Sequence, residues 1–347
     1  MKTRCLILAV GLCLWAAVAA RAFDTIKTTS STSITCKVTA VSWKEVGYDQ
    51  RGVPGSVPVN EVFTIFFEGE PSSMNTARTH LTKALYQEAL DSFNKVKTED
   101  ITNEWIAQDV VFYKAFCAAK LALGGTGDVV EAGKKMLAFA GQHTTSYHYL
   151  EACEVLGDLL VAAGKFSAAE AYYGRVAKAP WPDFQMRARV SMGMALLAQG
   201  TAAKTAQAEQ LFNSVLAMNV EGDLAKAQKM KATLGKARCQ VDKDAPAAIA
   251  AVKRIIADAD PEAVEMHALA YNTLGVALLK AGNDGEALLA FLHVHVLYFN
   301  VPNAHGEALF HLTKLWTKMG KADRARTTKK LLQDRYPNSR WTQTGGA

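Results

Sequence analysis

The stretch LGDLLVAAGKFSAAEAYYGRV (156–176) returns 118 residues later as LGVALLKAGNDGEALLAFLHV (274–294). Both copies begin with Leu-Gly, reach Ala-Gly seven residues further on, and then carry alanine, an aromatic residue and valine at matched positions. Apolar residues recur at helical spacing on both sides of the Ala-Gly pair. Gly164 and Gly282 are placed to end a helix, because glycine readily takes the left-handed conformation found there. Each copy therefore predicts two amphipathic helices joined by a tight turn.

The alanine of the second helix marks a repeat that extends over most of the chain. It recurs at intervals of 37 to 43 residues, at Ala89, Ala132, Ala169, Ala208, Ala248, Ala287 and Ala325. A period of this length is typical of architectures in which each unit buries its apolar face only against its neighbours. The spacing predicts a mainly α protein, with an α-solenoid of about seven helical hairpins over 72–340. We expect an elongated curved rod followed by a disordered tail at 341–347.

The repeated residues resemble those of the tetratricopeptide repeat (TPR), whose first helix carries Leu-Gly and whose second carries alanine and an aromatic residue. The Leu-Gly position of the first helix is filled by Leu156-Gly157, Met192-Gly193, Leu234-Gly235 and Leu274-Gly275. The aromatic position of the second helix is filled by Phe93, Tyr173, Phe212 and Phe291. The resemblance covers about residues 72–340. It implies TPR-like hairpins with a concave groove in which peptide segments bind. The units differ from the family in running longer than its roughly 34 residues, and those at Ala132 and Ala325 lack the Leu-Gly pair.

The first 22 residues are typical of a secretory signal peptide. Lys2 and Arg4 precede an apolar run from Cys5 to Ala20, and Ala20-Arg21-Ala22 offers small residues to a signal peptidase. An uncleaved membrane anchor is the alternative, although it requires about 20 apolar residues. Cleavage after residue 22 would lower the net charge from +6 to +3. This small excess gives no indication of nucleic-acid binding.

Residues 23–71 predict a small β domain ahead of the repeats. Alternating apolar residues from Ile34 to Ala40, and again from Val57 to Phe67, have the period of a strand. The segment DQRGVPGS (49–56) predicts a loop between them, and Pro58 suits an edge strand or a strand start. We expect a β meander or an SH3-like barrel. A β segment followed by helical repeats resembles the plan of exported bacterial repeat proteins.

Polar residues between the core positions of the first helices are candidates for a peptide-binding groove. They are Glu151, Glu154, Asp158, Arg187, Lys229, Lys236, Asn272 and Lys314. Their charge changes from acidic to basic along the chain, so such a groove could orient an extended peptide by complementary charge. The alternative is that they are ordinary solvated residues. They do not reproduce the Lys/Asn clamp that some TPR proteins use for carboxylates, and we do not assign that role.

Motifs for catalysis and for cofactors are absent from the sequence. It contains no P-loop, dinucleotide fingerprint, zinc-protease motif or nucleophile elbow. The glycine-rich LGGTG (123–127) falls where the repeat predicts a turn. A metal site formed by His295, His305 and His311 is conceivable, with packed or exposed histidines as the alternative. Cys36, Cys117, Cys153 and Cys239 show no disulfide spacing and are predicted to be buried thiols.

Together these observations predict an exported, non-catalytic TPR scaffold that binds a protein or peptide partner in the periplasm or cell envelope. No cofactor, nucleic acid or membrane span is expected after removal of the leader, and oligomer formation is left open. An alternative function is that of a structural envelope protein, which would self-assemble by end-to-end stacking or through its β segment. A third is a metal protein or enzyme that uses the histidines between residues 293 and 311.

Overall fold

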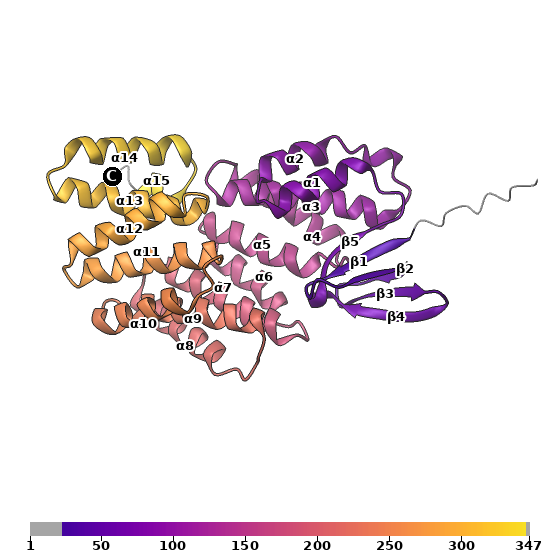
Figure 1. The fold of residues 1–347 in the computed structure, drawn as a ribbon, viewed down its shortest axis with the longest axis horizontal. Helices are drawn as coiled ribbons and strands as arrows, with labels where there is room; N and C mark the ends of the chain where they lie inside the picture. Colours follow the sequence, from indigo (N-terminus) through magenta and orange to yellow (C-terminus); the bar gives the residue numbers. More distant parts are fainter. Residues whose placement is uncertain (1–22, 345–347) are drawn as a thin grey trace, which may run out of the picture.

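The computed structural model describes residues 23–344, so the predicted signal peptide lies outside the described residues (Figure 1). The chain begins with a small antiparallel sheet and continues as a helical repeat. The strands are β1 (Asp24–Thr28), β2 (Ser33–Val41), β3 (Glu45–Gln50), β4 (Val53–Pro58) and β5 (Val62–Phe66). Their order in the sheet is β4-β3-β2-β1-β5, so the first four strands form a meander and β5 returns beside β1. The predicted β meander is therefore confirmed.

One face of the sheet forms its core, and the sequence alternation selects that face. Ile26, Val38, Val46 and Val57 are all buried, because residues two apart on a strand point to the same side. The β3–β4 hairpin turns at Arg51 and Gly52, both with positive φ, as tight hairpin turns require. The outer edge strand, β4, contains two prolines, which cannot donate hydrogen bonds to a further strand.

The helices form seven consecutive antiparallel hairpins, as the repeat predicts. They are α1 (Ser72–Thr82) with α2 (Tyr86–Asn94), α3 (Glu104–Leu123) with α4 (Val129–Gln142), α5 (Tyr149–Ala162) with α6 (Phe166–Val176), α7 (Pro182–Ala198) with α8 (Ala202–Leu216), α9 (Asp223–Gln240) with α10 (Ala245–Asp258), α11 (Val264–Lys280) with α12 (Asp284–Leu297), and α13 (Pro302–Lys318) with α14 (Ala322–Arg335). Short 3-10 turns lie at Val59–Glu61 and Thr98–Asp100. None of the helices within residues 23–344 has the length and apolarity needed to cross a bilayer.

The end of the chain differs from the prediction of a disordered tail. A short helix, α15 (Arg340–Thr344), follows the last hairpin. The ring of Trp341 lies 5.2 Å from that of Phe310 on α13, so this aromatic residue anchors the segment. Residues 345–347 lie outside the described part of the chain. The four cysteines of residues 23–344 are buried and unpaired, in agreement with the predicted buried thiols.

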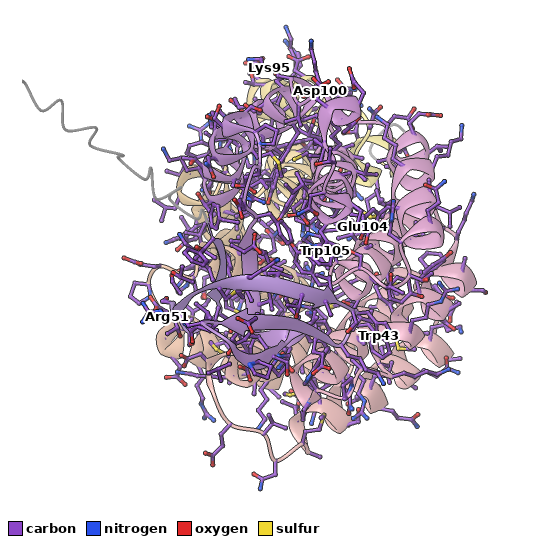
Figure 2. The ribbon with its side chains drawn as sticks, turned by 90° about the vertical axis from the view of Figure 1, so that its right-hand side faces the viewer. Trp43, Arg51, Lys95, Asp100, Glu104 and Trp105 are labelled. Carbon is purple, nitrogen blue, oxygen red and sulfur yellow. The ribbon has the colours of Figure 1, made fainter. Side chains whose placement is uncertain are left out.

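A buried ionic network joins the sheet to the first helices. The guanidinium of Arg78 on α1 contacts the carboxylates of Glu70 (2.5 Å) and Asp109 (3.1 Å), and donates to the carbonyl of Ile65 on β5 (3.0 Å). Asp109 also accepts from the Tyr147 hydroxyl at 2.9 Å. The sheet makes a second contact through Trp43 in the β2–β3 turn, which packs against a cluster of α5–α7 residues. Figure 2 shows Trp43 on the side of these helices and Arg51 at the other end of the sheet.

The repeat curls until its last hairpin meets the turn between α3 and α4. The main-chain N–H of Asn338 donates to the carbonyl of Gly125, and its side-chain amide donates to the carbonyl of Gly127, each at 3.1 Å. A Cβ on Gly125 would lie only 3.0 Å from Cβ of Ser339. The glycines of LGGTG (123–127) thus allow two distant segments to approach closely. This contact corrects the expectation of an elongated rod, because the two ends of the helical repeat touch (Figure 1).

Replacing Gly125 with alanine is expected to weaken this closure. Gly125 has φ +83° and a close neighbour, whereas Gly164 has φ +71° and an added Cβ there would meet nothing within 4 Å. Both Gly→Ala changes carry the strain of a positive φ, about 1 kcal/mol, so the difference between them isolates the closing contact. We expect Gly125→Ala to cost roughly 1 kcal/mol more in urea unfolding. We also expect it to raise the radius of gyration in small-angle scattering. Equal values for the two variants would contradict this role of the contact.

Candidate functional site

The inner surface of the repeat carries a cluster of charges drawn from four first helices. We call it the inner charge cluster; it consists of Lys120 on α3, Glu151, Glu154 and Asp158 on α5, Arg187 on α7, and Lys231 on α9. The three acids are spaced i, i+3 and i+7, which places them on one face of α5. The opposite face of α5 is apolar and packs into the core. The same helices therefore provide both the packing of the repeat and the charges that it presents.

Only some of these charges are paired with each other. Arg187 Nε lies 2.7 Å from Glu154 Oε2, and its guanidinium also lies over the ring of Phe184. The side chains of this pair are 33% and 16% exposed, so the ion pair is accessible from the inner surface. Asp158 accepts from the Tyr173 hydroxyl at 2.7 Å. Lys231 reaches Glu265 of α11 at 3.6 Å, which links the cluster to the next unit.

The carboxylates of the cluster differ in how well their charge is stabilised. Burial raises the pKa of Glu154 to about 7; the nearby charge of Arg187 opposes this rise, and Asp158 and Glu151 add to it. Burial also raises the pKa of Asp158, although the hydrogen bond from Tyr173 opposes the effect. The pKa of Glu151 is lowered despite partial burial, because the imidazole of His148, 3.6 Å away, favours the charged carboxylate. The charge on Glu154 is thus the one that folding stabilises least.

This raised pKa predicts a pH dependence of stability. The carboxyl group of Glu154 has a reference pKa of 4.5 and a folded-state pKa of about 7, so between these values the unfolded chain binds fewer protons than the folded one. The free energy of unfolding therefore falls as the pH rises through this window. From pH 5 to pH 8 we expect Glu154 to account for a loss of roughly 2 kcal/mol that the Glu154→Gln variant does not show. Urea unfolding at both pH values checks this, with exposed Glu88→Gln as control.

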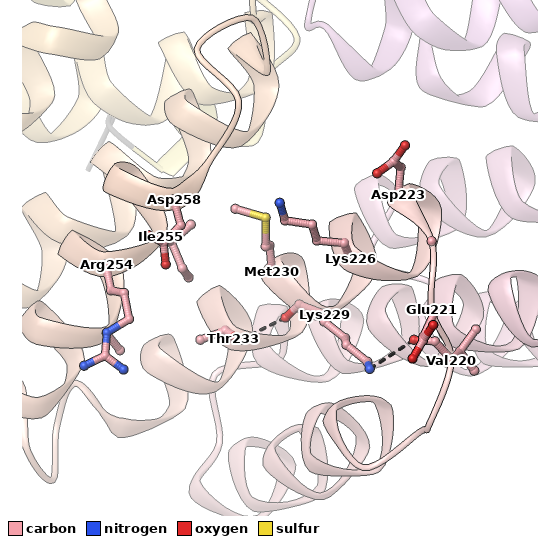
Figure 3. A pocket seen from close by; sticks show the side chains of 12 residues that line it. Val220, Glu221, Asp223, Lys226, Lys229, Met230, Thr233, Arg254, Ile255 and Asp258 are labelled. Carbon is pink, nitrogen blue, oxygen red and sulfur yellow. Dashed lines mark hydrogen bonds between the residues drawn. The ribbon is translucent and has the colours of Figure 1, made fainter. Parts of the chain in front are cut away.

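The other candidate groove residues lie apart from the inner charge cluster. Lys229 donates to the carbonyl of Val220 at 3.1 Å in a pocket of about 690 Å³ between the start of α9 and α10. Figure 3 shows this Lys229 side chain turned toward Val220, with Met230 and Ile255 also lining the pocket. Lys236 is half-buried on α9, and Lys314 is exposed with its ammonium 4.2 Å from the Phe310 ring centroid. The acids of α5 and Arg187 share one cluster instead of marking opposite ends of a groove.

Asn272 belongs to a second, more deeply buried set of polar groups. It is fully buried and donates to the carbonyl of Ala304 at 2.8 Å and to Glu307 at 3.1 Å. Glu307 also forms an ion pair with Arg238. This set joins α9, α11 and α13 through direct contacts between its members. Asn272 therefore holds neighbouring units together, and its amide nitrogen is already engaged.

Sequence reasoning missed two members of the inner charge cluster, Lys120 and Lys231. Lys120 follows Ala119 at the place where other units have Leu-Gly, so its departure from the repeat was a usable signal. Lys231 lies three residues before Leu234, where the clearest unit has the buried Cys153. By the repeat it is a core position. Its side chain is nevertheless 32% exposed, and its ammonium group reaches Glu265.

The histidines form a hydrogen-bonded pair instead of a three-histidine centre. Nδ1 of His295 lies 2.9 Å from Nε2 of His305, whose Nδ1 lies 2.7 Å from the Tyr336 hydroxyl. His311 stacks on Phe291, with the ring centroids 4.6 Å apart. Burial, with the charges of His295 and Arg335, lowers the pKa of His305 to about 3, so this ring is neutral. Within residues 23–344 no group of three His, Cys, Asp or Glu side chains is placed to hold a metal ion.

Comparison with known proteins gives the class of the fold. Residues 155–211 match the family model described as tetratricopeptide repeat. No curated protein sequence matches the chain. A Rap protein complexed with Competence and Sporulation Factor has a TM-score of 0.53 at 11% identity, and the match covers 76% of this chain and 73% of that one. A tetratricopeptide repeat protein from Parabacteroides merdae has a TM-score of 0.48 at 14% identity, with coverage of 79% and 98%.

The seven hairpins and the structural match to the Rap protein define the fold as a helical-repeat solenoid. More specifically, residues 155–211 match the tetratricopeptide repeat, as the resemblance in the sequence implies, and the other hairpins continue the same TPR-like arrangement. At 11% identity the likeness to the Rap protein shows the fold alone. TPR folds present a continuous surface of first helices and generally serve as scaffolds for protein–protein interaction.

Proposed function

We propose that this protein is a non-catalytic scaffold that binds an extended segment of a protein partner along the inner surface of α5, α7 and α9. The observation that carries the proposal is the partly exposed Glu154–Arg187 ion pair within the inner charge cluster. A partly exposed pair contributes little to stability, and both of its members can exchange their partner for a ligand. A peptide with an acidic and a basic side chain would then meet Arg187 and Glu154 together.

Two further observations support a binding role. The α5 acids lie outside the apolar core of the repeat, since the buried residues of this helix are on its other face. The Rap protein, which has a similar fold, was solved in complex with Competence and Sporulation Factor, so a chain of this fold can bind a partner. The apolar run at Cys5–Ala20 favours export, and we propose the periplasm or cell envelope as the location.

Crosslinked pull-down from an envelope fraction tests this function. The full chain, Glu154→Lys and the control Glu88→Lys are compared at low and high salt. Glu88 is exposed on α2, away from the inner charge cluster. Glu88→Lys therefore makes the same change of charge at a position that is not part of the proposed binding surface. We expect a protein captured by the full chain and by Glu88→Lys but lost with Glu154→Lys, and captured less at high salt. Identical capture by all three proteins would rule out the inner charge cluster as the binding surface.

Export needs its own measurement. Cell fractionation combined with N-terminal sequencing of the recovered protein is expected to find it outside the cytoplasm, beginning at Phe23. Recovery in the cytoplasm with residue 1 or 2 at the N-terminus would overturn the proposed location but not the proposed binding.

A further inference from the structure

Helix α12 is apolar on both of its faces. From Ala287 to Gly306 the chain has no Lys, Arg, Asp or Glu over 20 residues. The inward face of α12 is formed by Ala287, Ala290, Phe291 and Val294, all buried. A helix that packs only on one side is expected to carry polar residues on the other. The outward face of α12 breaks this rule.

The outward face carries exposed apolar side chains on both sides of His293. Leu289, Val296 and Leu297 are 59%, 61% and 58% exposed, and Phe299 just beyond the helix is 50% exposed. Positions 289, 292, 293 and 296 are related by helical spacing and lie opposite the buried face. These four exposed side chains are a third of the twelve large exposed apolar residues in the described chain. We call them, with Leu292 and His293, the α12 stripe; helix α12 itself packs against α11 and α13 near the C-terminal end of the repeat (Figure 1).

The charges at the two ends of the stripe have opposite sign. Glu286 is exposed in the first turn of α12, and within residues 23–344 it makes no ion pair or hydrogen bond through its carboxylate. At the other end, the guanidinium of Arg335 lies 5.8 Å from the Phe299 ring centroid, and no carboxylate of the described chain lies within ion-pair distance of it. If a second copy of the stripe runs antiparallel to the first, Glu286 of each copy lies near Arg335 of the other.

We infer that the α12 stripe binds a second copy of this chain in a two-fold symmetric dimer with the two α12 helices antiparallel. An axis that passes between Leu292 and His293 places Leu289 of each copy beside Val296 of the other, and Glu286 beside Phe299 and Arg335. An isologous interface requires this self-complementarity. Antiparallel helix dipoles also favour the arrangement.

Other occupants fit the stripe less well. An anionic bilayer would attract Arg335 but repel Glu286, so it suits only one end of the stripe. A helix from another protein usually binds in a groove, and neither of the pockets described for residues 23–344 includes a residue of α12. A helix of 14 residues is only about 21 Å long, which is short for an interface of the usual roughly 800 Å² per partner. We therefore expect a weak dimer, with a dissociation constant in the micromolar range.

Analytical ultracentrifugation of the full chain between about 1 and 100 μM tests this inference. We expect Leu289→Glu to raise the dimer dissociation constant at least tenfold, because it buries two unpaired charges in an apolar contact. Leu137→Glu on α4, at a leucine that is 50% exposed, is the matched control and should leave the constant unchanged. Glu286→Lys and Arg335→Glu should each weaken the dimer about threefold to tenfold. Combining both reversals should restore the wild-type constant.

Several results would overturn the inference. These are a monomer over the whole concentration range, a dimer that Leu289→Glu does not weaken, and a double charge reversal that is weaker than either single one. Association through any other segment, including the apolar run at Cys5–Ala20, does not respond to Leu289→Glu. Capture of a monomer by phosphatidylglycerol vesicles in a Leu289-dependent way would assign the stripe to a bilayer instead. Circular dichroism melts of each variant confirm that the fold is intact.

Discussion

Replacing Arg78 with methionine is expected to lower the free energy of unfolding by about 3–5 kcal/mol. The Arg78 side chain is 8% exposed, and its two carboxylate partners, Glu70 and Asp109, are 7% and 0% exposed. Methionine fills much of the same volume but leaves Glu70 buried without its counter-charge, and it leaves Asp109 facing the imidazole of His148, 3.2 Å away, in place of a guanidinium. Such an uncompensated charge costs several kcal/mol, far more than the net value of the intact pair. The same change also removes the hydrogen bond to Ile65 that joins the sheet to α1.

Urea unfolding followed by far-UV circular dichroism measures this fall in the free energy of unfolding. Two further variants test whether it comes from the buried charges. Lys134→Met removes an ion pair with Glu131 in which both side chains are exposed, and it should leave the free energy of unfolding nearly unchanged. Adding Asp109→Asn to Arg78→Met should recover part of the loss, because it removes one of the stranded charges. A cost for Arg78→Met as small as that for Lys134→Met would show that the network does not hold the sheet to the helices.

The helical repeat was predictable from sequence because its packing is local. Leu-Gly, alanine and an aromatic residue recur with a period, and each hairpin packs mainly on its neighbours, so the periodicity alone specifies the stack. The strand alternation around Val38 and Val57 was readable for a similar reason, since burial on one face requires a period of two. These inferences need no knowledge of how distant segments meet.

The contacts between distant segments were not predictable. Asn338 and Gly127 are 211 residues apart, and no periodic pattern relates them. Small changes in the angle between successive hairpins add up over seven units, and they decide whether the ends touch. The accumulated angle between hairpins also decides which charges come close to each other. Lys231 comes close to Asp158 only because α9 curls back toward α5. The sequence therefore indicated the α5 acids, Glu151, Glu154 and Asp158, but not the complete inner charge cluster.

The Leu-Gly pairs themselves lead to a prediction about Gly235. A Cβ at this position would lie 2.3 Å from Cζ and 2.6 Å from Cε1 of Phe212, closer than real Cβ atoms come. The same edge of the Phe212 ring also approaches Gly193 of the preceding unit, where a Cβ would lie 2.6 Å away. The ring is fully buried and lies between two helices. We therefore expect Gly235→Ala to lower the free energy of unfolding by about 3 kcal/mol, despite the better helix propensity of alanine.

A matched variant shows that the effect comes from packing. Gly133 lies inside α4, and a Cβ added there would meet nothing within 4 Å, so Gly133→Ala should stabilise the protein by roughly 0.5–1 kcal/mol. The two substitutions are chemically identical and should have opposite signs in urea unfolding. Phe212→Leu shortens the ring side chain, so adding it to Gly235→Ala should cost less than the sum of the two single changes. Strict additivity would mean that Gly235 is not required to make room for the ring, and the reason for a Leu-Gly pair in this unit would have to be sought in the backbone.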